Sequence, residues 1–153
     1  MRVWRLARGV YPPLDGEGVR RFGGRWNPPG LAVTYTAGSL ALAVLEVLVH
    51  VELEELPEDL TAFEIDVPED LLIETVEEAA LPADWQRIEG HPGCEAMGQV
   101  WVEGSRSAVL RVPSVVVRPA WNYLINPAHK EARRVTIASS SPFRFDARLR
   151  VFR

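Results

Sequence analysis

The sequence predicts a single domain of the α+β class, and three observations lead to that prediction. The chain contains several short segments that are rich in β-branched residues or that alternate apolar and polar residues, and these patterns indicate strands. Residues 40–53 form one dominant apolar helical segment, so strands and long helices do not alternate as in a doubly wound parallel sheet. The 153 residues contain no repeat and no linker, and this length suits one core. We therefore expect residues 1–153 to form one domain.

Each expected element has a local signal. Thr61–Val67 alternates apolar and polar residues, as a half-buried strand does, and a second alternating run extends from Phe143 to Val151. The segment from Gly23 to Gly30 is rich in glycine and proline, which predicts a loop with several turns. Other strands are expected at residues 3–7, 31–36, 108–112, 115–117 and 135–138, with a short helix at 95–103.

The helix predicted at 40–53 has a clear start. Ser39 stands directly before the apolar run and can cap a helix from Leu40 to Leu53. Residues 40–49 are apolar on every side except at Glu46. A helix that is apolar all round is normally buried, so this helix is predicted to lie in the core.

The net charge of −4 conceals a segregation of charge along the chain. Residues 1–50 carry six arginines and three acids, residues 51–86 carry thirteen acids and no base, and residues 87–153 carry eleven bases and five acids. Nucleic-acid-binding domains are normally basic overall, so direct nucleic-acid binding is not expected. The acidic stretch is interpreted either as a solvated surface or as a docking surface for a basic partner.

The sequence also favours a soluble, cytoplasmic protein. Cys94 is the only cysteine, so no intramolecular disulfide can form, and a reducing compartment is the default. The first residues are interrupted by arginines and lack the apolar segment of a secretory signal. The longest apolar run, Leu40–Val51, is shorter than the roughly 20 residues that a membrane-spanning helix needs. We therefore expect no association with a membrane.

Glu46 is the most informative single position. A carboxylate in the middle of a buried helix needs a partner, a cavity or a raised pKa, because an unpaired buried charge is costly. One interpretation is a structural ion pair with an arginine, or a contact with His50 four residues later. The other interpretation is an active-site carboxylate.

Four further residues could contribute to a ligand site. Arg25 lies in the glycine-rich loop, where backbone amides approach an anion closely and a guanidinium matches a phosphate, or it is simply an exposed turn residue. Tyr35 could stack on a planar ring, or belong to the core. Ser114 follows a proline within an apolar run, so its hydroxyl is expected to be buried and hydrogen-bonded. Asn122 lies beside aromatic residues, shortly before an Asn-Pro turn signal.

No metal site is expected. His91 and Cys94 are two potential ligands in one short segment, whereas a zinc site needs three or four. The sequence also contains no glycine-rich dinucleotide fingerprint and no phosphate-loop lysine motif, which excludes the commonest modes of nucleotide binding.

Taken in order along the chain, seven segments resemble the RES-domain family, which is named for its arginine, glutamate and serine. One departure lies at residues 94–97, where the family tends to have Thr-Gln before Gly98 and this chain has Cys-Glu-Ala-Met. The matching segments cover almost the whole chain and are GGRWN at 23–27, YT at 35–36, LALAVLEVLVH at 40–50, LPADW at 81–85, VLRVPS at 109–114, NYLINPAH at 122–129 and FRFDARL at 143–149.

The resemblance implies a fold similar to ADP-ribosyltransferases, with two small, mostly antiparallel sheets around a cleft for a nicotinamide dinucleotide. It implies a toxin of a type II toxin–antitoxin pair that destroys NAD and releases nicotinamide, by hydrolysis or by phosphorolysis. NAD is then the substrate, inorganic phosphate is a candidate co-substrate, and no tightly bound cofactor is expected. The usual partner is a DNA-binding antitoxin of the Xre type, and a homodimer is a further possible assembly.

The resemblance also assigns roles to the candidate residues. Arg25, Tyr35 and Glu46 are expected to be catalytic, and Arg25, Tyr35, Ser114 and Asn122 to bind the substrate. Three alternatives stay open: a transferase that places ADP-ribose on a macromolecule, a non-catalytic nucleotide-binding module in which Glu46 is structural, and a binding protein without a nucleotide site.

Overall fold

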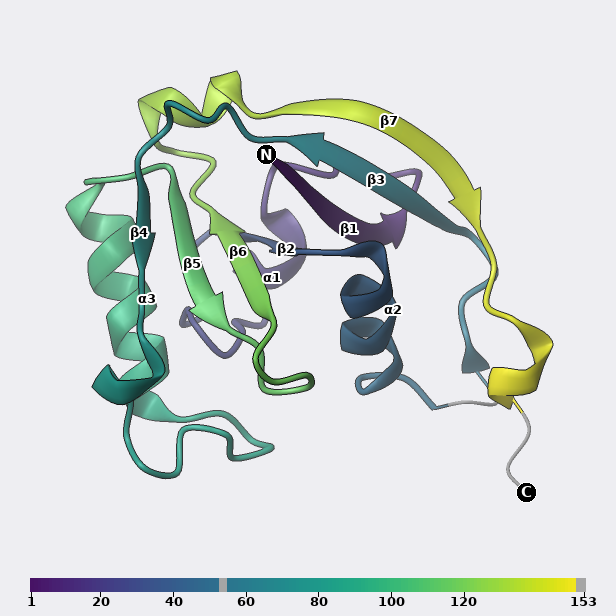
Figure 1. Ribbon diagram of the computed structural model, residues 1–153, viewed down its shortest axis with the longest axis horizontal. Helices are drawn as coiled ribbons and strands as arrows, with labels where there is room; N and C mark the ends of the chain where they lie inside the picture. The colour runs from purple at the N-terminus through teal and green to yellow at the C-terminus, as the bar shows by residue number, and fades with distance from the viewer. Residues whose placement is uncertain (53–54, 151–153) are drawn as a thin grey trace.

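Seven strands form one sheet in the computed structural model, which describes residues 1–52 and 55–150 (Figure 1). The order in the sheet is β4-β5-β6-β2-β1-β3-β7, and the strand pairs are antiparallel except for the parallel pair of β4 and β5. The predicted α+β class is confirmed. The strands are β1 (Arg2–Arg8), β2 (Thr34–Ala37), β3 (Leu60–Asp66), β4 (Ile73–Thr75), β5 (Val109–Pro113), β6 (Trp121–Ile125) and β7 (Thr136–Phe143). The helices are α1 (Glu17–Arg20), α2 (Leu40–Leu48) and α3 (Pro92–Gly104), with short 3₁₀ turns η2 (Glu78–Ala80), η3 (Lys130–Arg134) and η4 (Ala147–Arg150).

The sheet has two halves that join at one point. β1 pairs with β3 along its whole length and β2 pairs with β6 along its whole length, but β1 and β2 share only the register pair Trp4↔Ala37. In Figure 1 the β4-β5-β6 half and the β1-β3-β7 half run in different directions. The expectation of two small sheets is therefore corrected to one sheet with two halves, because this single pair keeps β1 hydrogen-bonded to β2.

Helix α2 begins as predicted but is shorter and more exposed. The Ser39 hydroxyl accepts a hydrogen bond at 3.1 Å from a backbone N–H of the first turn. The helix ends at Leu48, and the predicted end, Leu53, lies outside the described residues. Leu45 is 40% exposed and Val49 is 56% exposed. The predicted burial of this helix holds for the side that packs on the sheet, which includes Leu42 and Ala43, while the opposite side faces outward.

The longest helix is α3, with 13 residues. It begins at the His91 cap, whose Nδ1 accepts the Gly93 N–H at 2.9 Å, and it contains the short helix that the sequence predicts at 95–103. Pro92 occupies the first turn, where a missing N–H costs nothing. No described helix is both long and apolar enough to cross a membrane.

The chain differs from prediction in four strand segments. β7 ends at Phe143, and the rest of the run predicted at 143–151 contains the turn η4, with Val151 outside the described residues. Phe143 and Phe145 pack edge to face at 5.3 Å, and Asp146 accepts the Arg148 N–H at 2.9 Å, so the alternation there reflects a local turn. Residues 115–117 form a bend rather than a strand, and β4 and β6 are strands that the sequence did not reveal.

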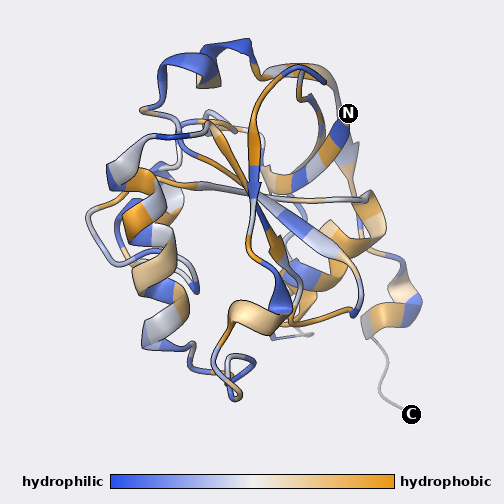
Figure 2. Ribbon diagram, turned by 60° about the vertical axis from the view of Figure 1, so that its left-hand side comes forward, coloured by the Kyte–Doolittle hydropathy of each residue, from blue (hydrophilic) through white to orange (hydrophobic). Residues whose placement is uncertain are grey.

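The two faces of the sheet carry separate cores. Figure 2 shows β1 changing between hydrophobic and hydrophilic residues along its length, next to the label N. On one face, Val3 and Ile65 from one half pack with Val109 and Ile125 from the other. On the opposite face, α3 and the loop before β2 pack on β5 and β6 through a second cluster, which includes Trp26, Trp85, Trp101, Leu110 and Leu124.

Gly98 gives a test of how closely α3 approaches the loop before β2. A Cβ atom at this position would overlap the carbonyl oxygen of Trp26, which is backbone and cannot rotate away. We expect Gly98→Ala to lower the free energy of unfolding by about 3 kcal/mol, measured by urea unfolding. Gly18→Ala in α1 is the matched control, because nothing lies within 4 Å of its added methyl group. Equal losses in the two variants would contradict the close approach.

Candidate functional site

Strand register places three of the predicted site residues on one face of the sheet. Ala37 of β2 pairs with Asn122 of β6, and Asn122 also pairs with Val112 of β5. Because side chains alternate between the faces, Tyr35, two residues before Ala37, and Ser114, two residues after Val112, share this face. Helix α2, which carries the predicted carboxylate, packs on the same face.

The Glu46 carboxylate is held by two donors that lie at the ends of β5 and β6. Its Oε1 atom accepts hydrogen bonds from the Ser114 hydroxyl at 2.9 Å and from Asn122 Nδ2 at 2.6 Å. The side chain is partly exposed, and no described residue donates to Oε2. Neither an arginine nor His50 pairs with Glu46 among the described residues. Glu46 is therefore anchored by neutral donors through one oxygen, and its other oxygen is free.

The Ser114 hydroxyl donates its proton to Glu46 because backbone N–H groups occupy its acceptor positions. Ser114 is 1% exposed, and its Oγ accepts the backbone N–H groups of Val116 and Val117, both at 3.1 Å. Since these two bonds use its acceptor positions, the hydroxyl donates to the carboxylate. Asn122 is less completely satisfied, because its Oδ1 is buried and has no partner among the described residues. A free acceptor thus lies beside the carboxylate.

Tyr35 supports the loop that precedes β2. Its hydroxyl donates to Asn27 Oδ1 at 2.7 Å and accepts the Trp26 N–H at 3.0 Å. Asn27 is completely buried, and its Nδ2 donates to two carbonyl oxygens of the same loop. Burial raises the pKa of Tyr35 above the ordinary tyrosine value. The hydroxyl is therefore neutral at physiological pH and is fully used in holding the loop.

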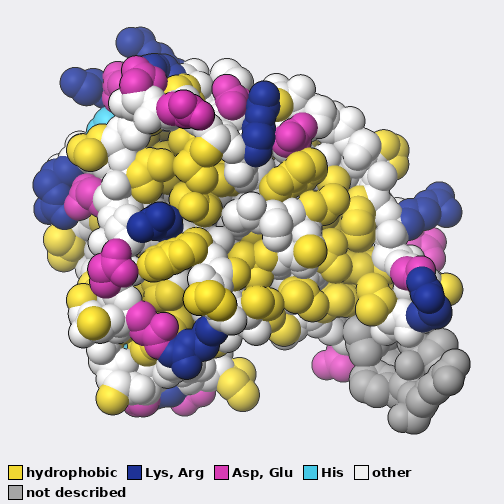
Figure 3. Space-filling model, viewed as in Figure 1, with side chains coloured by type: hydrophobic (Ala, Val, Ile, Leu, Met, Phe, Trp, Pro, Cys, Tyr) yellow, Lys and Arg dark blue, Asp and Glu magenta, His cyan; other side chains and the backbone are white. Residues whose placement is uncertain are grey.

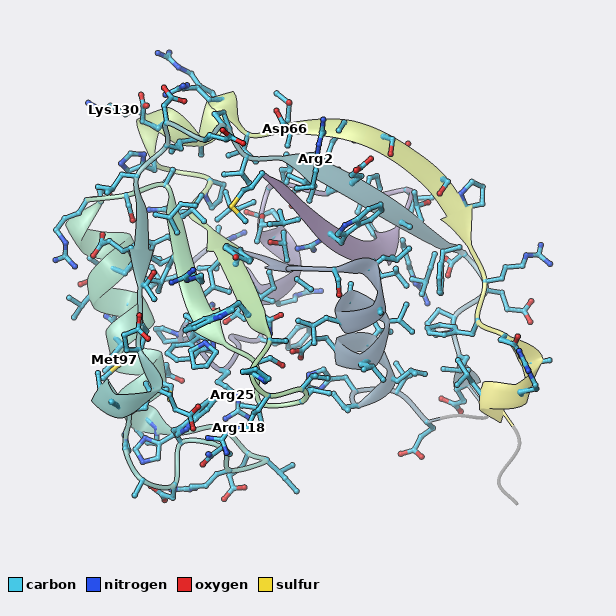
Figure 4. The ribbon with its side chains drawn as sticks, in the orientation of Figure 1. Arg2, Arg25, Asp66, Met97, Arg118 and Lys130 are labelled. Atoms are coloured by element: carbon cyan, nitrogen blue, oxygen red, sulfur yellow. The ribbon has the colours of Figure 1, made fainter. Side chains whose placement is uncertain are left out.

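Arg25 is bound to the segment that leads into α3. Its Nη1 and Nη2 atoms donate to the carbonyl oxygens of Trp85 and Arg87, both at 2.8 Å, and no described carboxylate forms an ion pair with it. Its positive charge partly offsets the effect of burial on the pKa of Tyr35. The Arg118 guanidinium lies 5.9 Å from the centre of the Trp85 ring, and Figure 4 shows Arg25 and Arg118 beside this segment. The segment around Trp85 therefore contacts two guanidinium groups, of which Arg118 is paired with Glu78.

The predicted residues form two adjoining groups. Glu46, Ser114 and Asn122 are joined by direct hydrogen bonds. Tyr35 lies diagonally across from Asn122 on the neighbouring strand, and Arg25 lies close enough to Tyr35 to shift its pKa. No hydrogen bond between described residues connects the two groups directly. The β2–β6 face thus brings a free carboxylate oxygen and an unpaired cation to one region.

Two features of this region are not apparent from the sequence. Asn27 is buried and forms several hydrogen bonds. The sequence indicates this role only through the position of Asn27 two residues after Arg25 in a predicted turn. The carbonyl oxygens that bind Arg25 belong to the backbone, so no pattern of side chains predicts them.

Cys94 is completely buried, and burial raises its pKa, so it is not an activated thiolate. Among the described residues, no three His, Cys, Asp or Glu gather as metal ligands.

Comparison with known proteins gives a consistent result. The family model described as RES domain matches residues 2–146. A protein of Sphingobium sp. (strain YBL2) named Prs ADP-ribosylating toxin is 36% identical over 152 residues, which are 95% of this chain and 94% of that protein. A protein of Photorhabdus laumondii named Toxin Res is 36% identical over 97% of each chain. A chain in the crystal structure of the M. tuberculosis MbcT-MbcA toxin–antitoxin complex superposes with a TM-score of 0.76 and 25% identity, over 93% of this chain and 83% of its own length.

The raised pKa of Tyr35 can be tested by titration. We expect Tyr35 to be the last of the three tyrosines to ionise, so Tyr35→Phe should lose the final step of the tyrosinate absorbance. Because the folded pKa exceeds the unfolded one, this group's contribution to stability is complete below about pH 10 and falls as the pH rises further. Tyr11→Phe is the control, since Tyr11 is 65% exposed. A final step that survives in Tyr35→Phe would contradict the assignment.

Proposed function

Because the chain belongs to the RES domain family, we propose that it is the toxin of a toxin–antitoxin pair and that it destroys NAD by breaking the bond between nicotinamide and ribose. The family match over residues 2–146 and the toxins among the relatives support the proposal. The observation that carries it is the Glu46 carboxylate, which is held on one oxygen by Ser114 and Asn122 and is free on the other.

The leaving group decides how many acidic groups the reaction needs. An ordinary glycosidic bond requires one carboxylic acid to protonate the leaving oxygen and a second carboxylate on the sugar. Nicotinamide in NAD already carries a positive charge, so the carbon–nitrogen bond breaks with its electron pair passing to the ring nitrogen and no proton added. The positive charge that develops on the ribose can then be stabilised by one carboxylate. A site built around Glu46 alone fits this chemistry.

In this mechanism Ser114 and Asn122 are positioning residues. Both bind Oε1, so they restrict rotation of the carboxylate and direct Oε2 to the ribose. The Asn122 Oδ1 is buried and lacks a partner among the described residues, so it would accept a hydrogen bond from a substrate hydroxyl or amide once the packing above it opens. The same two residues thus orient the catalytic group and offer a binding group next to it.

Tyr35 and Arg25 would act on other parts of the dinucleotide. Since the Tyr35 hydroxyl is occupied by the loop, its ring would contact the nicotinamide ribose. Arg25 binds two carbonyl oxygens, but each terminal nitrogen of a guanidinium carries a second N–H that can donate to a pyrophosphate. The absence of an ion pair with any described carboxylate leaves its positive charge available to that anion.

The acceptor of the ribosyl group is water or inorganic phosphate under this proposal. Transfer to a macromolecule is the second candidate, because the Sphingobium relative is named an ADP-ribosylating toxin. Incubating the protein with NAD labelled in its adenine, with and without phosphate, separates the two. Free ADP-ribose or its phosphate ester supports destruction of NAD, and label on protein or nucleic acid supports transfer. Saturable binding without turnover would favour a non-catalytic module.

We also propose a cytoplasmic antitoxin of the DNA-binding Xre type as the partner. The support is that the solved relative is part of a toxin–antitoxin complex. The surplus of acids in residues 51–86 would suit a partner that is basic because it binds DNA. Formation of a homodimer remains a prediction.

The Glu46→Gln variant tests the catalytic role. Its amide oxygen can still accept from Ser114 and Asn122, so the fold should be retained, but the negative charge is lost. We expect nicotinamide release to fall by roughly a hundredfold or more, measured chromatographically. Glu52→Gln, at an exposed acid six residues after Glu46, is the control and should keep wild-type activity. Undiminished release by Glu46→Gln would count decisively against the mechanism.

Arg25→Ala tests the binding of the pyrophosphate. The variant removes the positive charge and also the two hydrogen bonds to the segment around Trp85. We expect its affinity for NAD, measured by calorimetry, to fall by at least about tenfold. Arg21→Ala, whose guanidinium lies over the Phe22 ring, is the control and should bind normally. Unchanged affinity in Arg25→Ala would remove this residue from the phosphate role.

A further inference from the structure

Strand β4 forms one edge of the sheet, and part of its backbone is directed outward. The Val76 N–H donates to the Arg111 carbonyl of β5 at 2.9 Å, in a parallel pairing with the register Thr75↔Arg111. In a parallel ladder alternate residues bond to the same neighbour, so Glu74 and Val76 face β5, and Ile73 and Thr75 point their N–H and C=O groups to the open side. An extended chain laid beside β4 would find these groups unpaired.

A groove lies between β4 and α3. It has a volume of about 420 Å³. Val100 on its helical wall is 58% exposed, and Trp101 at its base is buried, with its ring N–H satisfied by Ser107 at 2.9 Å. The residues that line the groove include Glu74, Val76, Met97, Val100, Trp101 and Leu110. Its lining is thus mainly apolar, and it runs along the open edge of the strand.

The surroundings of the groove are acidic. β4 belongs to the stretch of residues 51–86 that has thirteen acids and no base. Glu77 follows the strand, and Glu103 lies on the same side of α3 as Val100. Among the lining residues Glu74 and Arg106 form an ion pair at 2.7 Å and balance each other, so the acidic charge of the rim comes from Glu77 and Glu103. Figure 3 shows hydrophobic side chains at its left, over β4 and α3, with acidic and basic side chains around them.

We propose that this groove binds a partner protein through an extended segment that alternates apolar and basic side chains and adds to the outer edge of β4. An edge strand next to a helix offers backbone hydrogen bonds on one side and a pocket for alternate side chains on the other, which is how peptides are recognised by strand addition. The acidic rim selects basic over acidic segments. None of its lining residues is Tyr35, Glu46, Ser114 or Asn122, so the proposal does not rest on the proposed activity.

The test uses a defined probe, the blocked peptide Val-Arg-Val-Arg-Val-Arg-Val, titrated into ¹⁵N-labelled protein. We expect amide shifts at Ile73, Thr75 and Met97, and no binding of the analogue with glutamate in place of arginine. Two further analogues carry N-methyl groups, one on its valines and one on its arginines. Strand addition requires that one of them loses binding while the other retains it, because only alternate N–H groups face β4. Equal effects of the two would overturn the proposal.

Three protein variants locate the site. Thr75→Pro removes an outward N–H that no strand bond uses, and Val100→Lys places a cation in the groove. Each should weaken binding of the probe by at least about tenfold, while Val100→Lys keeps wild-type release of nicotinamide. Val49→Lys is the matched control, since Val49 is 56% exposed at the end of α2. Shifts centred on the Glu46 region, or an equal effect of Val49→Lys, would show that the peptide binds elsewhere and would overturn the proposal.

Discussion

The two hydrogen bonds to Glu46 Oε1 are the contact on which the arrangement of the site depends, because they connect α2 to the ends of β5 and β6. Ser114 can donate to the carboxylate only because two backbone N–H groups occupy its acceptor positions, and these come from the bend that leads to β6. The Asn122 amide is oriented by the same carboxylate, which leaves its oxygen free in a buried position. A charged group on a largely apolar helix is thus kept in place by neutral partners, which do not cancel its charge. An ion pair would hold the helix as well but would neutralise the carboxylate.

The joint between the two halves of the sheet explains why this contact lies where it does. β1 and β2 share a single register pair, so the strands on either side can turn away from each other. On one face the halves close over a common apolar core that includes Val3 and Ile125. On the other face α2 packs on β1, β3 and Ala37 of β2, and α3 packs on β5 and β6. Tyr35 and Asn122 lie on this face between the two helices. The site residues therefore lie where the two helices meet the middle of the sheet, with Asn122 bonded to Glu46 of α2 and Tyr35 packed beside the cluster under α3.

The sequence predicts the local features of this fold better than its long-range ones. The Ser39 cap and the alternating strand around Phe63 follow from spacing alone, and the structure has both. The true end of α2 and the strand β6 do not follow, because they depend on which surfaces other segments cover. For the site, the sequence singles out the buried serine and the carboxylate, but not their hydrogen bond, since 68 residues separate them. The partners of Arg25 were beyond prediction for a different reason: they are backbone carbonyl oxygens, and any residue type supplies them.

The short connection between β2 and α2 constrains how such a chain can change in length during evolution. Only Gly38 and Ser39 separate the strand from the helix, and the Gly38 N–H is itself bonded to the Trp121 carbonyl of β6 at 3.0 Å. Tyr35 and Glu46 are therefore joined by an almost unbroken run of regular structure. One residue inserted within α2 ahead of Glu46 would rotate the carboxylate by about 100° around the helix axis, away from its donors. Insertions and deletions should accordingly spare the span from 35 to 46.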